Sequence, residues 1–290
     1  MKSNSVKKDS GSIPSSEGLP IAYDLYTPSH AMYELPVVLF LHGFKGFKDW
    51  GTFPDACIEI ASTGYAVLSM NFSLNGTGAN PCEFDRLDLF ARETLTQDLE
   101  DVASVLVALR DGTIKSSLVT LDPYNVSVIG HSRGGHTAVV AASELDQITL
   151  VVTWAAVSNV LKHWSEAQIK DWTTKGYTEI LNSRTGQKMR VDRVVYDDAV
   201  ENEKRLMAVN RVKDLNLPCC FIHGTDDDAV SFEHTQILYE NCPSSEKDRI
   251  FIDGANHTFG STHPYMDDNL PKKFTEVLDH TIRWLDSFNG

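Results

Sequence analysis

One serine lies between glycines, at a point where a strand would give way to a helix. Residues 130–134 read G-H-S-R-G, with Ser132 at the centre. The β-branched run 124–129 precedes them, and the helix-like stretch 135–142 follows. A chain that reverses from strand to helix within about four residues holds the serine in strained backbone space, and side chains beside it would clash. This order predicts a nucleophile elbow that exposes Ser132 at the carboxyl end of a sheet.

An elbow serine needs a base, and the base needs a carboxylate to orient it. In this architecture the three follow in the chain order Ser, Asp or Glu, His. Residues 219–224 read as a buried strand, and three adjacent aspartates, 226–228, come just after it. The apolar strand 249–252 is followed by a loop that contains His257. We therefore expect His257 to be the base, because a loop after a late strand lets it reach across the strand ends to the serine.

Four other histidines are weaker candidates for chemistry. His234 falls in a helical stretch, and His263 lies farther from the end of the strand. We interpret His131 and His223 as structural hydrogen-bonding residues. No pair of histidines has helical i, i+4 spacing with a third ligand nearby, so we expect no metal site.

A loop near the start of the chain is suited to bind an oxyanion. Residues 35–41 form a continuous apolar run, typical of a strand buried on both faces, and H-G-F-K-G follows at 42–46. One oxyanion donor of such a sheet is the backbone N–H after the nucleophile, here Arg133. We assign the second to the N–H of Phe44.

The elements that must position these residues alternate along the chain. The apolar and periodic patterns predict strands at 19–26, 35–41, 65–72, 126–129, 150–156, 219–224 and 249–252, and helices at 53–63, 94–110, 134–145, 201–212 and 230–239. Such alternation is typical of βαβ units and a mostly parallel sheet. Residues 1–18 are rich in serine and lysine and lack periodicity, so we expect a flexible tail before one domain at 19–290.

One connection is too long for a plain βα link. About forty residues, 157–200, precede the helix expected before the strand at 219–224. We interpret them as a cap inserted in the domain, with Trp164, Trp172 and Tyr177 as candidate substrate-binding residues. The alternative is an ordinary surface insertion that its aromatic residues anchor.

Composition excludes several partners. The net charge of −14 argues against nucleic acid or an anionic membrane, because either would need a basic footprint. No stretch approaches the ~18 apolar residues of a membrane span, and no apolar segment follows the charged N-terminus as in a secretory signal. Five cysteines without metal-type spacing predict free thiols in a reducing compartment, and hence a cytoplasmic protein. Oligomeric state is not predicted.

The motifs H-G-F, G-H-S-R-G-G, H-G-T-D-D-D and G-A-N-H together resemble the α/β-hydrolase superfamily, from about residue 21 to the C-terminus. Within it, the chain is similar to the serine relatives of dienelactone hydrolase, including bacterial cinnamoyl and feruloyl esterases. Carried over by position, the resemblance implies Ser132 as nucleophile, His257 as base, and Phe44 and Arg133 as oxyanion donors. Asp227 is implied as the acid because it fits the family spacing H-G-x-x-D, and its two neighbours remain open.

The chain departs from the cinnamoyl esterases in two places. Those enzymes usually have glutamine after the serine, where this chain has Arg133, whose cation could lie at the mouth of the site or fold back onto a carboxylate. The segment between Ala156 and Leu217 has no close match to their cap. Both differences bear on the substrate rather than on the chemistry.

These features predict a serine carboxylic-ester hydrolase that needs no cofactor and acts on a small-molecule ester. Three alternatives share the fold. A peptidase of the prolyl-oligopeptidase type would carry an N-terminal propeller, whereas about thirty residues precede the first core strand. An acyl-CoA thioesterase would need a basic patch, and a non-catalytic receptor on this fold typically loses a triad member.

Overall fold

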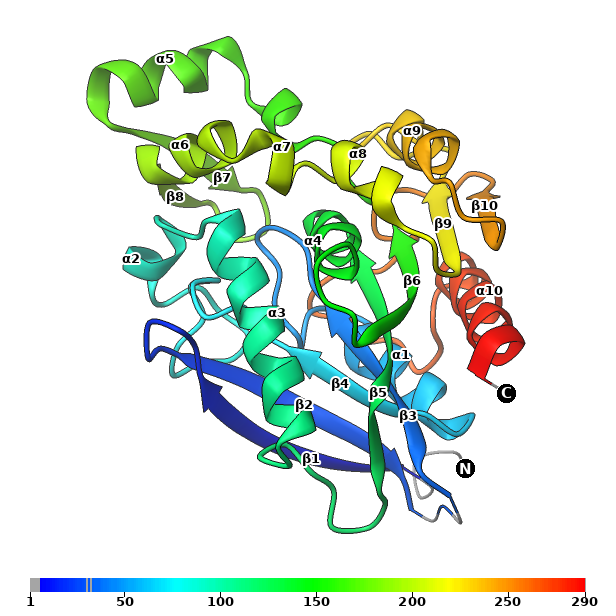
Figure 1. The fold of residues 1–290 in the computed structure, drawn as a ribbon. Coiled ribbons are helices and arrows are strands. Elements are labelled where there is room, and N and C mark those ends of the chain that lie inside the picture. Colours follow the sequence, from blue (N-terminus) through cyan, green and yellow to red (C-terminus); the bar gives the residue numbers. More distant parts are fainter. Residues whose placement is uncertain (1–5, 30, 32, 290) are drawn as a thin grey trace.

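The computed structural model describes residues 6–29, 31 and 33–289 (Figure 1). One eight-stranded sheet, in the order β1-β2-β4-β3-β5-β6-β9-β10, forms its centre. β1 and β2 pair antiparallel, β2 meets β4 antiparallel, and the other neighbours are parallel. The strands span β1 Val6–Pro14, β2 Pro20–Pro28, β3 Leu35–Leu41, β4 Ala66–Met70, β5 Leu121–His131, β6 Ile148–Trp154, β9 Cys219–Gly224 and β10 Lys247–Ile252.

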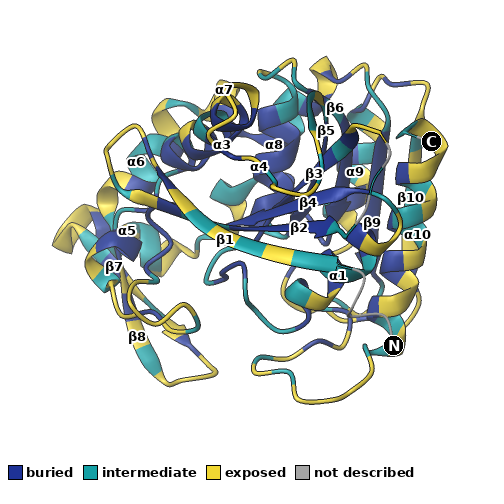
Figure 2. Cartoon of the chain, turned by 90° about the horizontal axis from the view of Figure 1, so that it is seen from below, coloured by how far each residue is buried: buried dark blue, intermediate teal, exposed yellow. Residues whose placement is uncertain are grey.

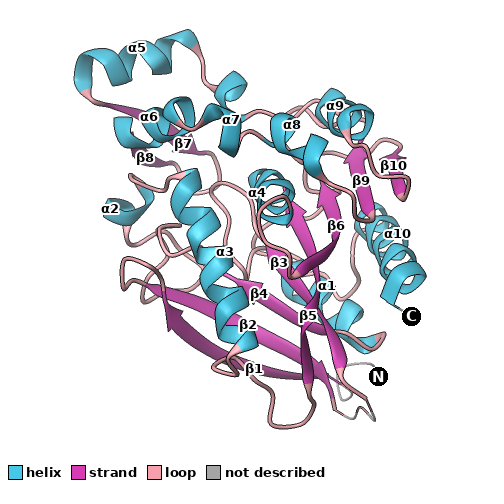
Figure 3. Cartoon of the chain, in the orientation of Figure 1, coloured by secondary structure: helices cyan, strands magenta, loops and turns pink. Residues whose placement is uncertain are grey.

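Helices cover both faces of the sheet (Figure 3). α1 (Phe53–Ser62) and the C-terminal α10 (Lys272–Asn289) share one face, and α3 (Leu95–Arg110) and α4 (Arg133–Ala142) lie on the other. The short helix α2 (Leu87–Phe90) precedes α3, and α9 (Glu233–Asn241) lies between β9 and β10 in the chain. This layered, mostly parallel architecture confirms the α/β fold class expected from the sequence.

The continuous apolar run of β3 follows from its two buried faces. Val37, Leu39 and Leu41 pack into the core under α3 and α4. Val38 and Phe40 pack into the opposite core, under α1 and α10. Successive side chains of a strand point to opposite faces. In a central strand between two helical layers, both faces are buried, so every position is suited to an apolar side chain.

The N-terminal segment corrects the expectation of a flexible tail over 1–18. Residues 6–14 form β1, which pairs along its whole length with β2, from Val6 opposite Pro28 to Pro14 opposite Pro20. Figure 2 shows β1 at the edge, mostly partly buried or exposed. Only Ile13 of β1 is buried, so backbone pairing rather than an apolar pattern holds the strand, and hydrophobic periodicity gave no signal for it. Residues 1–5 lie outside the described residues.

Residues 160–201 lie together at one end of the molecule (Figure 1), and we call them the cap. Their buried side chains, Trp172, Met189, Val191 and Val195, pack in one cluster with Phe47, Phe84 and Phe90 from the rest of the chain. It consists of the 3-10 turn η2 (Val160–His163), α5 (Glu166–Lys175), the antiparallel hairpin β7 (Tyr177–Asn182) and β8 (Gln187–Asp192), and α6 (Arg193–Glu201). The helix expected at 201–212 is instead two short helices, α7 (Glu203–Leu206) and α8 (Ala208–Arg211), followed by η3 (Val212–Asp214).

None of the helices in the described residues combines the length and the apolarity that crossing a membrane requires. All five cysteines of the chain are described, and none of them is in a disulfide.

A buried ion pair fastens the loop that follows β3. The Lys48 ammonium lies 2.6 Å from both Asp24 Oδ2 and Asp49 Oδ2, and Asp24 is buried in β2. The Lys48 backbone N–H also donates to Asn71 Oδ1 at 2.7 Å, just after β4. Burial favours a raised pKa for Asp24, but hydrogen bonds from Lys48 and Ser10 outweigh it and lower that pKa. The loop is therefore tied to two neighbouring strands.

Replacing Lys48 should destabilise the protein. Lys48→Met leaves the Asp24 carboxylate buried without its main cation, and we expect the free energy of unfolding to fall by about 3 kcal/mol. This is the low end for a broken buried pair, because the half-exposed Lys8 remains 3.4 Å from Asp24. Urea denaturation measures the loss. Lys188→Met removes an exposed charge on β8 and should stay within about 0.5 kcal/mol; equal losses in the two variants would contradict the role of the pair.

Candidate active site

Ser132 lies at a strained turn between β5 and α4. Its backbone has φ 56° and ψ −118°, a left-handed conformation that side-chain-bearing residues rarely adopt. A Cβ on Gly130 would lie 2.2 Å from the carbonyl oxygen of Gly134, and one on Gly134 would lie 2.3 Å from that of Leu41. Because both contacts are with backbone, only glycine fits at these positions, as the elbow motif requires.

His257 and Asp227 extend from Ser132 in a chain of hydrogen bonds. His257 Nε2 is 3.0 Å from Ser132 Oγ, and its Nδ1 is 2.8 Å from Asp227 Oδ2. The other carboxylate oxygen, Oδ1, accepts from the backbone N–H groups of Ala229 at 3.0 Å and Val230 at 2.8 Å. The Asp227 side chain is fully buried, while that of His257 is 20% exposed. This geometry suits a hydroxyl, a base and an orienting acid.

Asp227 carries its charge in spite of burial. Desolvation alone would raise its pKa, but hydrogen bonds from His223, His257 and the Val230 N–H lower it well below the usual range. His223 Nε2 lies 3.0 Å from Asp227 Oδ2, and its Nδ1 lies 2.9 Å from Thr235 Oγ1. A His223 that donates from Nε2 therefore accepts from Thr235, and it holds the same carboxylate oxygen that His257 contacts.

The neighbouring aspartates differ in their surroundings. Asp226 and Asp228 are both exposed. Asp226 accepts a hydrogen bond from Thr225 Oγ1 at 3.2 Å, and neither residue contacts a histidine in the described structure. Of the three candidates left open by the sequence, the structure brings Asp227 to His257.

The remaining histidines occupy other positions. His131 Nε2 is 2.9 Å from the backbone oxygen of His257, and burial, with the nearby His257, lowers the pKa of His131 to about 3. His131 therefore holds the backbone of the base while staying neutral. His234 Nδ1 lies 2.8 Å from Ser158 Oγ, and His263 Nδ1 accepts from the Gly51 N–H at 2.9 Å.

Two residues that line the cavity of Ser132 have backbone N–H groups without a backbone acceptor among the described residues. The loop after β3 passes directly beside the serine, since a Cβ on Gly43 would lie 2.9 Å from Ser132 Cβ. Neither Phe44 N–H nor Arg133 N–H has a backbone acceptor among the described residues, and both residues line the same cavity as Ser132. Unpaired N–H groups beside a nucleophile are suited to stabilise an oxyanion.

The cavity at Ser132 has a volume of about 350 Å³. Its wall is mainly apolar and comes from the sheet edge, from α3 and from the cap. The lining residues are Phe44, Lys45, Leu95, Ser132, Arg133, Val157, Val160, His163, Trp164, Gln168, Ile180, Val195, Ala199, Ala229, Val230 and His257. This volume suits a small molecule.

The structure corrects two of the three substrate-binding residues expected in the cap. Trp164 lines the cavity, whereas Trp172 and Tyr177 do not. Trp172 is buried behind Trp164, with ring centroids 4.8 Å apart, and stacks on Tyr196 at 4.9 Å. Tyr177 lies under the Arg190 guanidinium, 4.2 Å from the ring centroid. The aromatic residues of the segment predicted a binding role for all three. Only the packing in the structure distinguishes Trp164, which lines the cavity, from residues that pack behind it or outside it.

The Arg133 side chain folds back onto two buried carboxylates. Its Nη2 is 2.7 Å from Asp98 Oδ2, and its Nη1 is 3.3 Å from Glu93 Oε2. The guanidinium also lies 5.3 Å from the ring centroid of Phe44. Burial raises the pKa of Asp98 and of Glu93 even though Arg133 opposes the shift. The cation is therefore used to balance acids behind the site, not to meet a ligand.

Asp98 was not expected from the sequence, although a signal exists. It lies four residues before Val102 and seven before Val105, in phase with the apolar face of α3. A carboxylate on a buried helix face requires a cation, and Arg133 supplies it.

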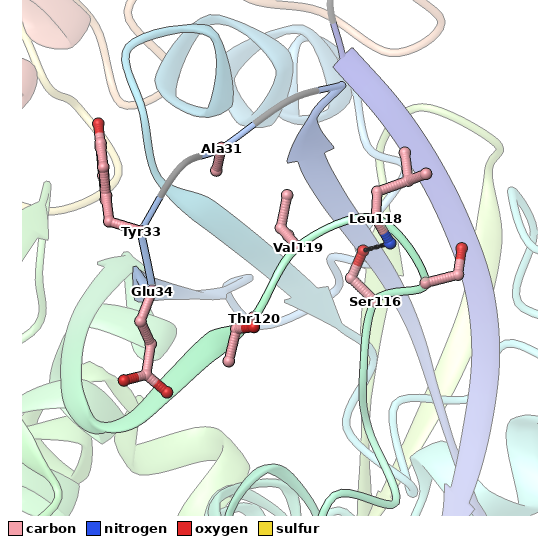
Figure 4. A pocket seen from close by; sticks show the side chains of 8 residues that line it. Ala31, Tyr33, Glu34, Ser116, Leu118, Val119 and Thr120 are labelled. Atoms are coloured by element: carbon pink, nitrogen blue, oxygen red, sulfur yellow. Dashed lines mark hydrogen bonds between the residues drawn. The ribbon is translucent and has the colours of Figure 1, made fainter.

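Other cavities lack this chemistry. One of about 510 Å³ lies at the amino ends of β3 and β5, lined by residues that include Tyr33, Glu34 and Thr120 (Figure 4). Ser132 is at the opposite, carboxyl end of β5. Within the described part of the chain, no three His, Cys, Asp or Glu side chains gather so that they could hold a metal ion.

Removing the Arg133 cation should make stability depend more strongly on pH than in the wild type, where burial already raises the pKa of Glu93 and of Asp98. In Arg133→Met, Glu93 and Asp98 stay buried without their cation, and we expect the free energy of unfolding to fall by about 3–5 kcal/mol at pH 8. The folded variant binds more protons than the unfolded chain, so its stability falls as pH rises from the ordinary carboxyl pKa of about 4 through the raised values.

Urea denaturation at pH 5 and pH 8 measures this difference. The loss should be smaller at pH 5. The matched control is Arg205→Met, which breaks the surface pair of Arg205 with Glu144 and should cost at most about 1 kcal/mol at either pH. Equal losses for Arg133→Met at both pH values would contradict the charge assignment.

Comparisons with known proteins identify the family and the fold of this chain. The chain is 34% identical over 76 residues to the alpha/beta hydrolase domain-containing protein aho-3 of Caenorhabditis elegans, covering 26% of this chain and 22% of that protein. The chain thus matches about a fifth of the length of such curated relatives.

Two solved structures share the fold. Est1E from Butyrivibrio proteoclasticus, bound to ferulic acid, has a TM-score of 0.68 and 18% identity, covering 95% of this chain and 99% of that chain. A puromycin-hydrolyzing peptidase of Mycobacterium tuberculosis has a TM-score of 0.69 and 16% identity, covering 98% of this chain and 39% of that chain. The family model of BD-FAE matches residues 23–242. The chain therefore belongs to the BD-FAE family and has the α/β-hydrolase fold.

Proposed function

We propose that this protein is a serine hydrolase that cleaves carboxylic esters of small molecules. The observation that carries the proposal is the continuous chain of hydrogen bonds from Ser132 through His257 to Asp227, at the wall of a 350 Å³ cavity. A hydroxyl with a base at 3.0 Å and a buried, charged acid behind that base is equipped for acyl transfer.

In the proposed reaction, His257 Nε2 takes the Ser132 proton as Oγ attacks the ester carbonyl carbon. The C=O π electrons move to the oxygen, and the N–H groups of Phe44 and Arg133 stabilise the resulting oxyanion. Asp227 stabilises the imidazolium. When the oxyanion collapses, the C–O bond to the alcohol breaks and His257 returns its proton to the leaving alkoxide. Water then attacks the acyl-enzyme by the same steps, and no group outside the protein is needed.

Several features support an ester with a bulky or aromatic acyl group. Phe44 and Trp164 present aromatic rings to the cavity, 6.1 Å apart between centroids. Est1E is described with ferulic acid, an aromatic carboxylic acid, and cleavage of an aromatic ester here would release such an acid. One of the similar structures is a peptidase, so amide cleavage is the alternative reaction that the experiments must distinguish from ester cleavage.

The five free thiols support a reducing compartment such as the cytoplasm.

Loss of the nucleophile should abolish activity without unfolding the protein. We expect Ser132→Ala to hydrolyse p-nitrophenyl esters at least about 10³-fold more slowly, and His257→Ala to lose nearly as much because the residues act as a unit. A fluorophosphonate should label the wild type once, at Ser132, and not label Ser132→Ala. Mass spectrometry of the labelled peptide decides this, and a label on another residue would disprove the assignment.

The adjacent aspartates provide matched controls for the acid. Asp227→Asn should lower kcat by orders of magnitude, whereas Asp226→Asn and Asp228→Asn, at exposed positions, should keep kcat within about tenfold of the wild type.

Aminoacyl p-nitroanilides, assayed beside the esters, distinguish ester cleavage from amide cleavage. Faster cleavage of the anilides than of the esters would assign the protein as a peptidase instead.

Trp164 should determine part of the substrate preference. Trp164→Ala removes part of the cavity wall but no catalytic group. For long-chain or aromatic esters, kcat/KM should therefore fall by a factor that corresponds to a loss of about 1–3 kcal/mol in transition-state stabilisation, while kcat/KM for p-nitrophenyl acetate stays unchanged. Tyr177→Ala is the control, because Tyr177 lies outside the cavity. If acetate falls in parallel with the larger esters, Trp164 is scaffolding and does not contact the substrate.

A further inference from the structure

One cation at the cavity has no partner in the protein. Lys45 lines the cavity of Ser132 and is half-buried. Its ammonium makes no hydrogen bond and no ion pair with any residue of the described chain. Desolvation by this partial burial lowers the pKa of Lys45. A cation held in this way lacks the compensation that buried charges ordinarily have.

The other two cations nearby are fully compensated. Lys48, three residues along the same loop, lies 2.6 Å from each of two carboxylates. Arg133 lies against Glu93 and Asp98, which are behind the cavity and not in its wall. Lys48 therefore has two acidic partners that stabilise the fold, whereas Lys45 in the same loop has none among the described residues.

The cavity wall leaves the Lys45 charge uncancelled. Among the lining residues there is no aspartate and no glutamate, and apart from Lys45 and the neutralised Arg133 the ionisable side chains are His163 and His257. The chain as a whole carries a net charge of −14. A positive position inside a mainly apolar cavity of an acidic protein is thus a local feature that selects for a ligand of opposite charge.

The position of Lys45 in the chain places its backbone next to the proposed oxyanion donor. Lys45 follows Phe44, whose N–H is the proposed oxyanion donor, and Lys45 has φ 58°, in the left-handed region. Lysine has no intrinsic preference for that backbone, which glycine or asparagine adopts more readily. One loop therefore presents both an N–H group for the reacting carbonyl and an ammonium for a second group of the same molecule.

Resting on the proposed ester hydrolysis, we propose that Lys45 binds a free carboxylate of the substrate, so that the preferred substrates are esters that carry a carboxylate. The carboxylate can belong to the acyl part, as in a hemiester of a dicarboxylic acid, or to the alcohol part, as in an acyl ester of a hydroxy acid. The apolar wall accommodates the carbon skeleton between the ester and the carboxylate.

Matched pairs of esters test this proposal and separate the two sources of the carboxylate. For the acyl side, mono-4-nitrophenyl adipate is compared with its neutral methyl ester. For the alcohol side, 4-acetoxybenzoate is compared with methyl 4-acetoxybenzoate. The readout is the ratio of kcat/KM for the anionic ester to that for the neutral ester, corrected for spontaneous hydrolysis, in wild type, Lys45→Met, Lys45→Arg and Lys188→Met.

We expect one of the two ratios to fall at least about tenfold in Lys45→Met, as for the loss of a charge-assisted hydrogen bond. Lys45→Arg should restore part of that ratio. Because each ratio compares two esters in the same variant, an effect of the substitution that is common to both esters cancels. Lys188→Met carries the same change in net charge at an exposed site outside the cavity, and should leave both ratios unchanged. Ratios in Lys45→Met equal to those of the wild type would overturn the proposal.

A binding measurement keeps this test independent of turnover. Calorimetric titration with 3-phenylpropionate and with 3-phenylpropanamide, in wild type and Lys45→Met, should show the carboxylate weakened at least about tenfold by the substitution and the amide unaffected. Equal weakening of both probes, or of neither, would overturn the role of Lys45. If no ester is hydrolysed and Ser132 is not labelled by a fluorophosphonate, the proposed function fails while this titration still decides the carboxylate site.

Discussion

The strained backbone of Ser132 is the constraint on which the site depends. A left-handed serine persists only where its surroundings force it, and here they are backbone atoms: the carbonyl of Gly134 against Gly130, and that of Leu41 against Gly134. These contacts join β3, β5 and the start of α4 at one point. The two apolar cores that clamp the sheet from both faces therefore also hold the serine out of its preferred conformation.

The same crowding brings the loop after β3 to Ser132. Gly43 lies against Ser132, so the loop after β3 cannot shift without disturbing the elbow. Lys48 fixes the far side of this loop to Asp24 in β2 and, through its N–H, to Asn71 after β4. Arg133 acts at the other side: its backbone begins α4 and its side chain is bound to acids of the α3 region. Charges buried away from the cavity thus position uncharged N–H groups inside it.

Much of this could be predicted from the sequence, because the chemistry lies at the ends of strands that apolar runs mark clearly. The order of Ser132, Asp227 and His257 along the chain, with the parallel sheet, was enough to expect their convergence, and the α/β fold class is confirmed. Residue type could not separate Asp227 from its neighbours, and only the spacing from His223 favoured it. In the structure, Asp227 is distinguished by its contact with His257 and by the two N–H groups on its carboxylate.

The misses have a common physical reason: they depend on contacts that the residue pattern of the segment itself does not reveal. β1 is polar and exists because β2 offers it backbone hydrogen bonds, and Tyr177 is aromatic but covered by Arg190 rather than by a ligand. The same reasoning applies to charge. From the sequence, Arg133, Lys45 and Lys48 are equivalent cations near the site, and only the structure shows that two of them are neutralised by carboxylates while Lys45 has none among the described residues. What distinguishes a structural cation from one available to a substrate is therefore the presence of its acid, and that acid comes from elsewhere in the chain.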